Sequence, residues 1–313
     1  MTRAVPPIAL LISTFAFVLP AHAAGSLTRT FVSSTGVDTN PCTIAAPCAS
    51  FAAAYAAVAA GGIIAALDPG KYGPVTITST VTIDGNGWAA ITAPNVNNGA
   101  GITINGLSND KIILRGLIVD GAGGAPYGIV FNSGDTLTID DIVIRNISAF
   151  GLAFLSSVGT TQTQTLSVSN SHFFSNANGV SIQAFGSGAI GASFARTEFI
   201  GNQSEGLTSL TGGGNVAIAV TDSVAANNGD RGFLINSGNV GTINLLLTRC
   251  QVANNVAGVE AAKVGATIWL AQSTLTGNAS GYLRSIGGVV NSYGDNYITD
   301  TNNTGVLVNV SKQ

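Results

Sequence analysis

Five phrases of eleven residues decide the fold: LSVSNSHFFSN (166–176), ASFARTEFIGN (192–202), IAVTDSVAANN (218–228), LLLTRCQVANN (245–255) and IWLAQSTLTGN (268–278). Each phrase begins with alternating apolar and polar residues and ends on an asparagine, so the asparagines recur at intervals of 26, 26, 27 and 23 residues. A fixed period in the twenties is typical of a repeat protein.

A second marker keeps the same register. A glycine followed by an apolar residue recurs at Gly101, Gly128, Gly151, Gly179, Gly206, Gly232, Gly258, Gly281 and Gly305. Leucine-rich repeats have a similar length, but their spaced leucines and helical half are missing here. The pattern predicts an all-β, single-domain right-handed parallel β-helix of about ten coils. Equivalent residues of successive coils then lie ~4.8 Å apart.

The composition suits such a solenoid and excludes one class of partner. Of 313 residues, 46% are hydrophobic and 9% charged, and 40 are glycine, as expected for a fold with many turns. Without Arg3, eleven basic side chains face fifteen acidic ones. This balance gives no electrostatic footprint for nucleic acid, so we expect no nucleic-acid partner.

The first 23 residues read as a signal peptide. Arg3 precedes an apolar run over 8–19, and Ala21 and Ala23 form an A-x-A cleavage site. We therefore expect export to the periplasm or the extracellular space after cleavage near Ala23. No second apolar run reaches the ~20 residues of a membrane helix, so no membrane span is expected in the mature chain.

Residues 24–62 are expected to form a strand, a disulfide loop and a capping helix, ahead of coils over 63–313. Cys42 and Cys48 favour a disulfide over a metal site, because a metal would need more ligands nearby. Residues 50–60 predict an alanine-rich helix, which would cover the open end of the solenoid. Cys250 shares its column with serine and threonine and is expected to point inward.

Three stretches also carry a family resemblance: FVSSTGVDTNPC (31–42), APCASFAAAYAAVAAGG (46–62) and TITSTVTIDG (76–85). With the coils that follow, they resemble secreted right-handed β-helix proteins of the pectin-lyase-like superfamily, in its uncharacterised bacterial branch. The resemblance implies the fold over nearly the whole mature chain. It does not imply one activity, since that superfamily includes lyases, glycosidases, epimerases, adhesins and tailspikes. The G-H-G and R-x-K motifs of polygalacturonases and the W-I-D-H and R-x-P-x-x-R motifs of pectate lyases are absent.

One charged cluster is a candidate catalytic site: Asp120, Asp140, Asp141, Arg115 and Arg145. Arg115 and Asp140 share a coil position, and so do Asp120 and Arg145, which places opposite charges on neighbouring coils. The carboxylates could act as general acid and base on an acidic sugar, or hold Ca²⁺. Alternatively, these side chains form ion pairs that stabilise the stack, and this interpretation is favoured. No other cofactor and no metal site is indicated.

Two further columns bear on function. The recurring asparagines are expected to pass amide hydrogen bonds from coil to coil, a structural role. Trp269 lies in an outward column and is a candidate ligand-binding platform for a sugar ring. The sequence thus favours an exported, non-catalytic surface protein with extracellular polysaccharide or cell-surface glycan as partner. The alternative is a polysaccharide lyase or glycoside hydrolase acting on acidic glycans. The sequence does not predict an oligomeric state.

Overall fold

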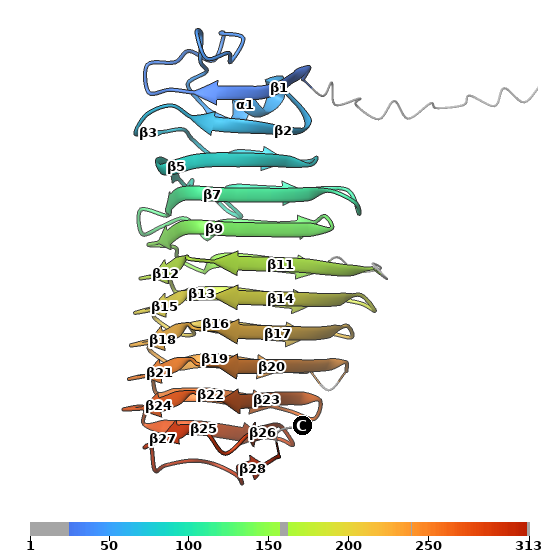
Figure 1. The fold of residues 1–313 in the computed structure, drawn as a ribbon, viewed down its shortest axis with the longest axis vertical. Coiled ribbons are helices and arrows are strands. Elements are labelled where there is room, and N and C mark those ends of the chain that lie inside the picture. The colour runs from blue at the N-terminus through green and yellow to red at the C-terminus, as the bar shows by residue number, and fades with distance from the viewer. Residues whose placement is uncertain (1–24, 157–161, 239, 312–313) are drawn as a thin grey trace, which may run out of the picture.

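A computed structural model of the protein describes residues 25–156, 162–238 and 240–311, and the expected signal peptide, 1–23, lies outside these residues. The chain winds into a stack of coils whose strands lie one above another along a single axis (Figure 1). Neighbouring strands in its two sheets run parallel, with Ile218 opposite Leu245 in one sheet and Phe233 opposite Val259 in the other. The predicted parallel β-helix is confirmed.

The smaller sheet contains one strand from each of nine successive coils. Its strands are β4 (Val75–Ile77), β6 (Ala100–Asn105), β8 (Tyr127–Ser133), β10 (Phe150–Ser156), β13 (Asn178–Ala184), β16 (Leu207–Thr211), β19 (Arg231–Asn236), β22 (Ala257–Ala262) and β25 (Ser280–Ser285). Eight turns of the solenoid separate these nine strands. The expectation of about ten coils was therefore slightly too high, because the marker glycine at Gly305 falls in the irregular C-terminal segment and not in a strand.

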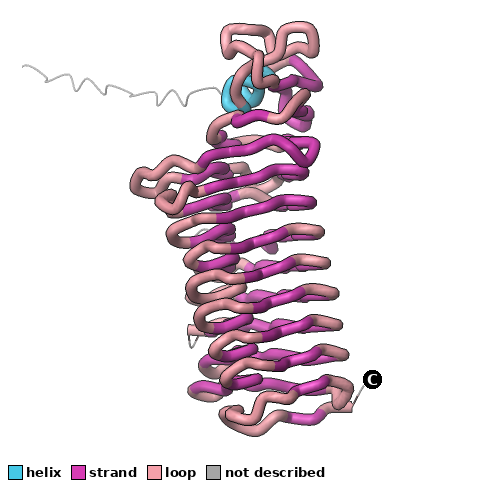
Figure 2. The backbone as a smooth tube through the Cα atoms, turned by 90° about the vertical axis from the view of Figure 1, so that its left-hand side faces the viewer, coloured by secondary structure: helices cyan, strands magenta, loops and turns pink. Residues whose placement is uncertain are grey.

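The larger sheet bends around the other two sides of each coil. At its N-terminal end lie β1 (Leu27–Val32), β2 (Val58–Ala66), β3 (Gly70–Lys71), β5 (Val81–Thr92), β7 (Lys111–Asp120) and β9 (Thr136–Arg145). From there on, each coil has a longer strand: β11 (Thr163–Ser169), β14 (Ala189–Ala195), β17 (Asn215–Thr221), β20 (Thr242–Thr248), β23 (Ala266–Ala271), β26 (Val289–Ser292) and β28 (Val308–Asn309). A shorter strand follows each of the first six: β12 (His172–Phe174), β15 (Glu198–Ile200), β18 (Val224–Ala226), β21 (Gln251–Ala253), β24 (Thr274–Thr276) and β27 (Tyr297–Ile298). Figure 2 shows the repeated turns from the side.

The bend between the longer and shorter strands depends on one residue per coil in the left-handed backbone region. These residues have φ between 49° and 62°: Gly116, Asp141, Asn170, Arg196, Asp222, Arg249 and Gln272. Most carry polar side chains that point outward from the corner. We call this set the corner column.

The core fills the inside of the coils with apolar side chains in register. Phe131 and Phe154 stack with ring centroids 4.2 Å apart, and Phe173 and Phe199 stack at 5.7 Å. Buried apolar residues alternate with outward residues along β17, β20 and β23, as a period of two requires. Cys250 is buried on the inner side, as the sequence predicted.

A short helix and a disulfide loop lie at the N-terminal end. Helix α1 spans Phe51–Ala57, and the Ser50 hydroxyl caps it by accepting a hydrogen bond from the Ala53 amide. The sequence predicted a helix to residue 60, but the chain turns extended at Val58 because β2 pairs with both β1 and β5. Strand β2 therefore crosses the boundary expected between 24–62 and 63–313. The predicted disulfide between Cys42 and Cys48 is present.

Candidate functional site

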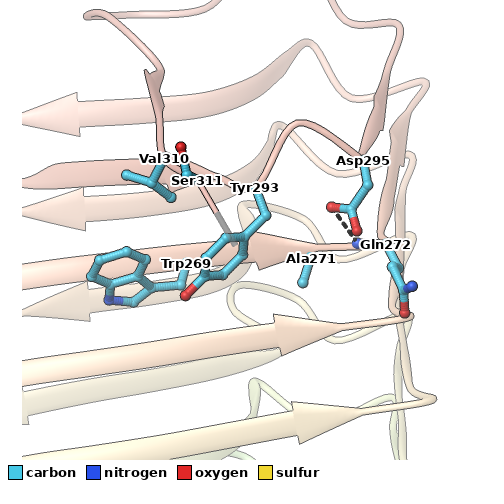
Figure 3. Close-up of a pocket in the computed structure, with 7 residues that line it drawn as sticks. All are labelled: Trp269, Ala271, Gln272, Tyr293, Asp295, Val310 and Ser311. Carbon is cyan, nitrogen blue, oxygen red and sulfur yellow. Dashed lines mark hydrogen bonds between the residues drawn. The ribbon is translucent and has the colours of Figure 1, made fainter. Parts of the chain in front are cut away.

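A hollow with an aromatic wall lies on the longer strands near the C-terminal end of the stack. Trp269 points outward from β23, between the buried Ile268 and Leu270. Its indole stacks on the ring of Tyr293, with centroids 5.9 Å apart and 26° between the planes (Figure 3). The pair borders a hollow of about 770 Å³, also lined by Ala271, Gln272, Asp295, Val310 and Ser311. The backbone amide of Gln272 donates a hydrogen bond of 3.1 Å to Asp295 Oδ1, which holds one wall of the hollow in place.

A second hollow, of about 430 Å³, continues from Trp269 across the same face. The outward column that leads to Trp269 reads Ser167, Ser193, Ala219 and Leu246 in strand register. The small outward side chains of Ser193 on β14 and Ala219 on β17 make the surface of this sheet shallow there. Leu246 and Trp269 are larger and protrude at the C-terminal end of the column. From β11 to β23 the face extends ~19 Å along the axis, at ~4.8 Å per coil.

Few of the described residues that line the two hollows are charged. Among the described residues that line the two hollows, Asp295 is the single carboxylate, and no lysine, arginine or histidine is present. The rest of the lining is apolar, hydroxyl or amide. These described residues offer stacking and hydrogen bonds, and none of them is a cation that could neutralise an acidic ligand.

The charged cluster predicted from the sequence separates into two groups. Asp120 and Arg145 are register partners, and Arg145 Nε donates to Asp120 Oδ2 at 2.9 Å. Burial raises the pKa of Asp120, but hydrogen bonds from the Ala122 amide, Asn146 and Arg145 outweigh this and hold the pKa below its usual value. Asp120 is thus held as an ionised carboxylate in an ion pair.

Asp140 belongs to the other group. Its Oδ1 accepts hydrogen bonds of 2.7 Å from the Ser169 hydroxyl and from Asn170 Nδ2, and these lower its pKa. Arg115 is its register partner, as predicted, but the guanidinium turns to the preceding coil and pairs with Asp84 at 2.7 Å. Arg115 and Asp140 therefore do not form the ion pair that their shared coil position suggested.

Asp141 occupies the corner column, with φ of 54° and an exposed side chain. Within the described part of the chain, no hydrogen bond or ion pair joins Asp140 or Asp141 to the Asp120–Arg145 pair. The bend at Asp141 lies between Asp140 and Arg145, so the two groups stand on different sides of the corner. The candidate residues share neighbouring coils without converging on one point.

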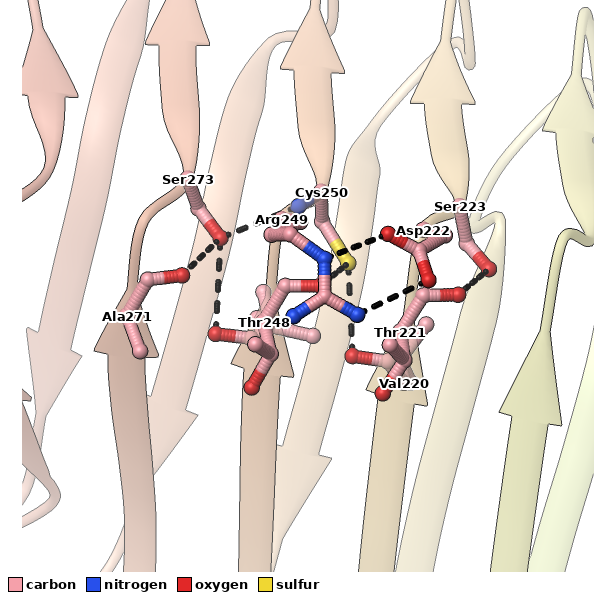
Figure 4. Close-up of polar contacts among 10 residues, drawn as sticks. Val220, Thr221, Asp222, Ser223, Thr248, Arg249, Cys250, Ala271 and Ser273 are labelled. Atoms are coloured by element: carbon pink, nitrogen blue, oxygen red, sulfur yellow. Dashed lines mark hydrogen bonds and ion pairs between the residues drawn. The ribbon is translucent and has the colours of Figure 1, made fainter.

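The corner column continues as a ladder of compensated charges. Arg196 Nε donates to Asn170 Oδ1 at 2.7 Å. Arg249 donates to both carboxylate oxygens of Asp222, at 2.6 and 2.9 Å (Figure 4). In the corner column, Arg249 thus pairs with an acid and Arg196 with an amide of the coil before it. The same picture shows Cys250 Sγ turned inward, within 3.4 Å of the carbonyl oxygens of Val220 and Thr248.

The recurring asparagines form a buried ladder, as predicted. Asn228 Oδ1 accepts from the amide and the Nδ2 of Asn202, at 3.1 and 2.9 Å, and Asn228 Nδ2 donates to Phe199 O and Asn255 Oδ1. The same pattern runs from Asn176 to Asn278: Asn176, Asn202, Asn228, Asn255 and Asn278 are all buried. These amides are saturated by the chain itself and have a structural role.

Sequence reasoning did not find three further polar contacts. His172 Nδ1 lies 2.9 Å from Glu198 Oε2 on the shorter strands, beside a hollow of about 330 Å³. Arg231 contacts Asp230 and places Nε 2.7 Å from the buried Glu260. The repeat placed His172 and Glu198 in one column, but no local motif marked Glu260. Its neighbours come from two other coils.

Two negative findings concern metals and membranes. Over residues 25–156, 162–238 and 240–311, no group of three or more His, Cys, Asp or Glu side chains could hold a metal ion. Calcium at the Asp120, Asp140 and Asp141 positions stays a prediction. No helix in the same ranges is long and apolar enough to cross a bilayer.

Comparison with known proteins supports the fold. No protein-family model matches the sequence, and no curated protein matches it. Among solved structures, pectate lyase Pel9A is similar with a TM-score of 0.59 and 17% identity, over 91% of this chain and 80% of the lyase. The A-modules of the Azotobacter vinelandii mannuronan C-5 epimerases AlgE4 and AlgE6 have TM-scores of 0.47 and 0.48, 13% and 15% identity, and cover 81% of this chain. The A-modules themselves are covered over 91% and 92% of their lengths.

The chain therefore shares the parallel β-helix fold of pectate lyase Pel9A, the fold that the resemblance implied. At 17% identity, the similarity to the lyase shows the architecture of the chain. Its activity has to be inferred from the residues of the site.

Proposed function

We propose that this is an exported, non-catalytic β-helix protein that binds extracellular glycan chains on the face of its longer strands. The stacked pair of Trp269 and Tyr293 beside an open hollow is the observation that supports this proposal. Aromatic side chains with a polar edge suit ligands with both an apolar face and hydroxyl groups, which describes a sugar ring. The ~19 Å run of low surface leading to Trp269 matches a linear chain more closely than a single sugar.

The composition of the walls favours an uncharged glycan. A polyuronate brings one carboxylate per sugar, and these need arginine, lysine or a metal ion as partners. Among the described residues that line the two hollows, no side chain is basic. Gln272 and Ser311 can exchange hydrogen bonds with neutral hydroxyl groups.

The state of the candidate catalytic carboxylates agrees with a binding role. A general acid at neutral pH needs a raised pKa, but the hydrogen bonds around Asp120 and Asp140 lower theirs. Arg115 and Arg145 are each held by an acidic partner. In this arrangement the charges stabilise neighbouring coils.

Tryptophan fluorescence tests the proposal directly, because the chain has two tryptophans and Trp88 can be replaced. A Trp88→Phe protein, with Trp269 as its remaining indole, is titrated with xyloglucan and galactomannan as neutral probes and polygalacturonate as the acidic one. We expect a change in emission with at least one neutral probe. Replacing Trp269 by Ala should weaken binding about tenfold, or ~1.4 kcal/mol.

Trp88→Ala is the matched control, since Trp88 is an exposed tryptophan that lies outside both hollows. It should bind as the wild type does. Equal affinity of the Trp269→Ala protein, or binding confined to polygalacturonate, would refute the proposed site.

A second candidate function is a polysaccharide lyase or hydrolase that acts on acidic glycans through Asp120, Asp140, Asp141, Arg115 and Arg145. Its support is the architecture shared with a pectate lyase. Incubation of the purified protein with polygalacturonate and alginate, with and without Ca²⁺, would then release unsaturated or reducing ends. Products that disappear in an Asp140→Ala variant would establish this function in place of the first.

Export stays part of the proposal. The expected signal peptide ends near Ala23, and the disulfide between Cys42 and Cys48 suits an oxidising compartment. Mass spectrometry of the protein recovered from the periplasm or medium of an expressing bacterium should show a mature N-terminus near Ala24.

A further inference from the structure

A second hollow with an aromatic wall lies on the outer face of the nine-stranded sheet. It measures about 420 Å³ and is lined by Asn98, Thr103, Tyr127, Val130, Asn132 and Leu155. Tyr127 and Phe150 are register partners on β8 and β10, and their rings stack with centroids 6.4 Å apart and 15° between the planes. Both rings are partly exposed and pack against a small apolar cluster outside the main core.

The stack of Tyr127 and Phe150 ends at Tyr127, because the preceding coil has a small residue in the same column. The coil before Tyr127 has Ala100 in the same column, and the coil after it has Phe150. A row of stacked rings therefore stops at Tyr127, where the next position, ~4.8 Å away, carries a methyl group. Tyr127 lines the hollow of about 420 Å³, and Ala100 lines the neighbouring hollow that shares Thr103 with it, so the row of rings ends where the two hollows meet.

The side chains that line this hollow indicate what kind of ligand ring could pack against Tyr127. Among the described residues, the lining contains the amides of Asn98 and Asn132, the hydroxyl of Thr103 and no charged side chain. Asn132 Nδ2 donates to Asn105 Oδ1 at 2.9 Å, so this amide is oriented. An amphipathic ring with several hydroxyl groups suits an aromatic wall edged by amides.

The hollow also extends toward the N-terminal cap. A neighbouring hollow of about 290 Å³ shares Thr103 and reaches Tyr55, and its lining is likewise uncharged. The Tyr55 hydroxyl is fixed by the Thr78 amide at 2.8 Å and by the Ser79 hydroxyl at 2.9 Å. Two tyrosines thus mark the ends of one uncharged groove that spans several coils.

We infer that this groove is a second binding site for an uncharged glycan, and that the protein holds two glycan chains at once. The first part stands on the Tyr127 groove alone, and the second rests on the function proposed for Trp269. The two sites lie on different sheets. From β8 to β22, the strand just before that of Trp269, the nine-stranded sheet has five strand spacings, or ~24 Å. Because the two sites also face different sides of the coil, an oligosaccharide bound along one site would have to bend around the solenoid to reach the other, so occupation of both places two separate chains on one protein.

The number of sites is measured by calorimetric titration with cellohexaose and mannohexaose. We expect two ligands per wild-type protein with at least one probe, and one ligand for the Tyr127→Ala and Thr103→Arg variants. Thr103→Arg fills the groove from a partly exposed outward position and serves as a second disruption if Tyr127→Ala loosens the apolar cluster. Phe185→Ala, which removes another exposed aromatic next to the same sheet, should still bind two. Circular dichroism confirms that each variant is folded.

Linking is measured by light scattering of xyloglucan and galactomannan solutions. Wild-type protein should raise the scattering, and Tyr127→Ala should bind the polymer at Trp269 without raising it. One ligand per protein, lost in Trp269→Ala and unchanged in both groove variants, overturns the second site and leaves the proposed function intact. Ligand that is lost in the groove variants but retained in Trp269→Ala supports the groove and contradicts the role of Trp269. No binding of either probe overturns both.

Discussion

The asparagine ladder offers the sharpest test of how the coils are held together. Asn228 is 2% exposed and lies in the middle of the ladder. Replacing it by Ala removes the four hydrogen bonds of its side chain, to the amide and Nδ2 of Asn202, to Phe199 O and to Asn255 Oδ1. The buried Asn202 amide loses its partner, which costs about 1–3 kcal/mol, and the other three bonds contribute about 1 kcal/mol each before relaxation. We expect a loss of about 3–5 kcal/mol.

The measurement is urea denaturation followed by circular dichroism, with the free energy of unfolding compared between variants of similar m-value. Asn244→Ala is the control, because Asn244 is an exposed asparagine on β20 of the next coil, and it should change stability by less than about 0.5 kcal/mol. A loss below about 1 kcal/mol for Asn228→Ala would refute the role given to the ladder.

An aspartate at the same position extends the test. At the end of the ladder, Asp300 accepts from the amide and Nδ2 of Asn278, at 3.0 and 2.8 Å. A carboxylate can end such a ladder but cannot continue it, because it has no N–H to donate. Asn228→Asp should therefore destabilise at least as much as Asn228→Ala, and a stable Asn228→Asp protein would contradict this account.

Three further predictions concern the cap and the buried thiol. Replacing Cys42 and Cys48 by Ser should lower the free energy of unfolding by about 2 kcal/mol, measured in urea, because the disulfide closes a short loop; an unchanged midpoint would contradict this. Burial raises the pKa of Cys250 to about 11, so at about pH 8 roughly one thiol in a thousand is ionised, and iodoacetamide should label it in urea but not in the native protein, as read by mass spectrometry. Hydrogen bonds from the Ser33 and Tyr72 hydroxyls lower the pKa of Asp68 to about 2, below its unfolded value of about 3.9. The stability that Asp68 provides is thus complete above about pH 4 and is lost as pH falls toward 2, so Asp68→Asn should lower the melting temperature at neutral pH and flatten its decline over that window, and a parallel decline would contradict this.

Local and periodic features were predictable because they depend on the position of a residue in its coil. The alternation in 166–169 and the asparagine at 176 recur in five phrases, and the parallel coils and the amide ladder followed from them. The register of Arg115 with Asp140 and of Asp120 with Arg145 was correct for the same reason. Residues in the same column of neighbouring coils have their backbones one strand spacing apart, so the column predicts which residues are neighbours.

Which neighbour a side chain contacts was not predictable in this way. Arg115 lies between Asp84 on one coil and Asp140 on the next, and its long side chain turns to Asp84. The helix from Phe51 ended at Ala57 although alanine continues to 60, because pairing of β2 with strands on both sides outweighs helix propensity.

The sequence by itself thus determined the parallel coils, the inward and outward faces and the buried asparagines, since each is written into every repeat. Tertiary structure decided which residues join Trp269 in the candidate site. Trp269 and Tyr293 occupy different columns, and the turn after β26 brings their rings together. Asn98, from the segment before β6, joins Tyr127 in the lining of its hollow. Each of these contacts is made by residues that do not recur from coil to coil, so the repeat pattern of the sequence could not predict them.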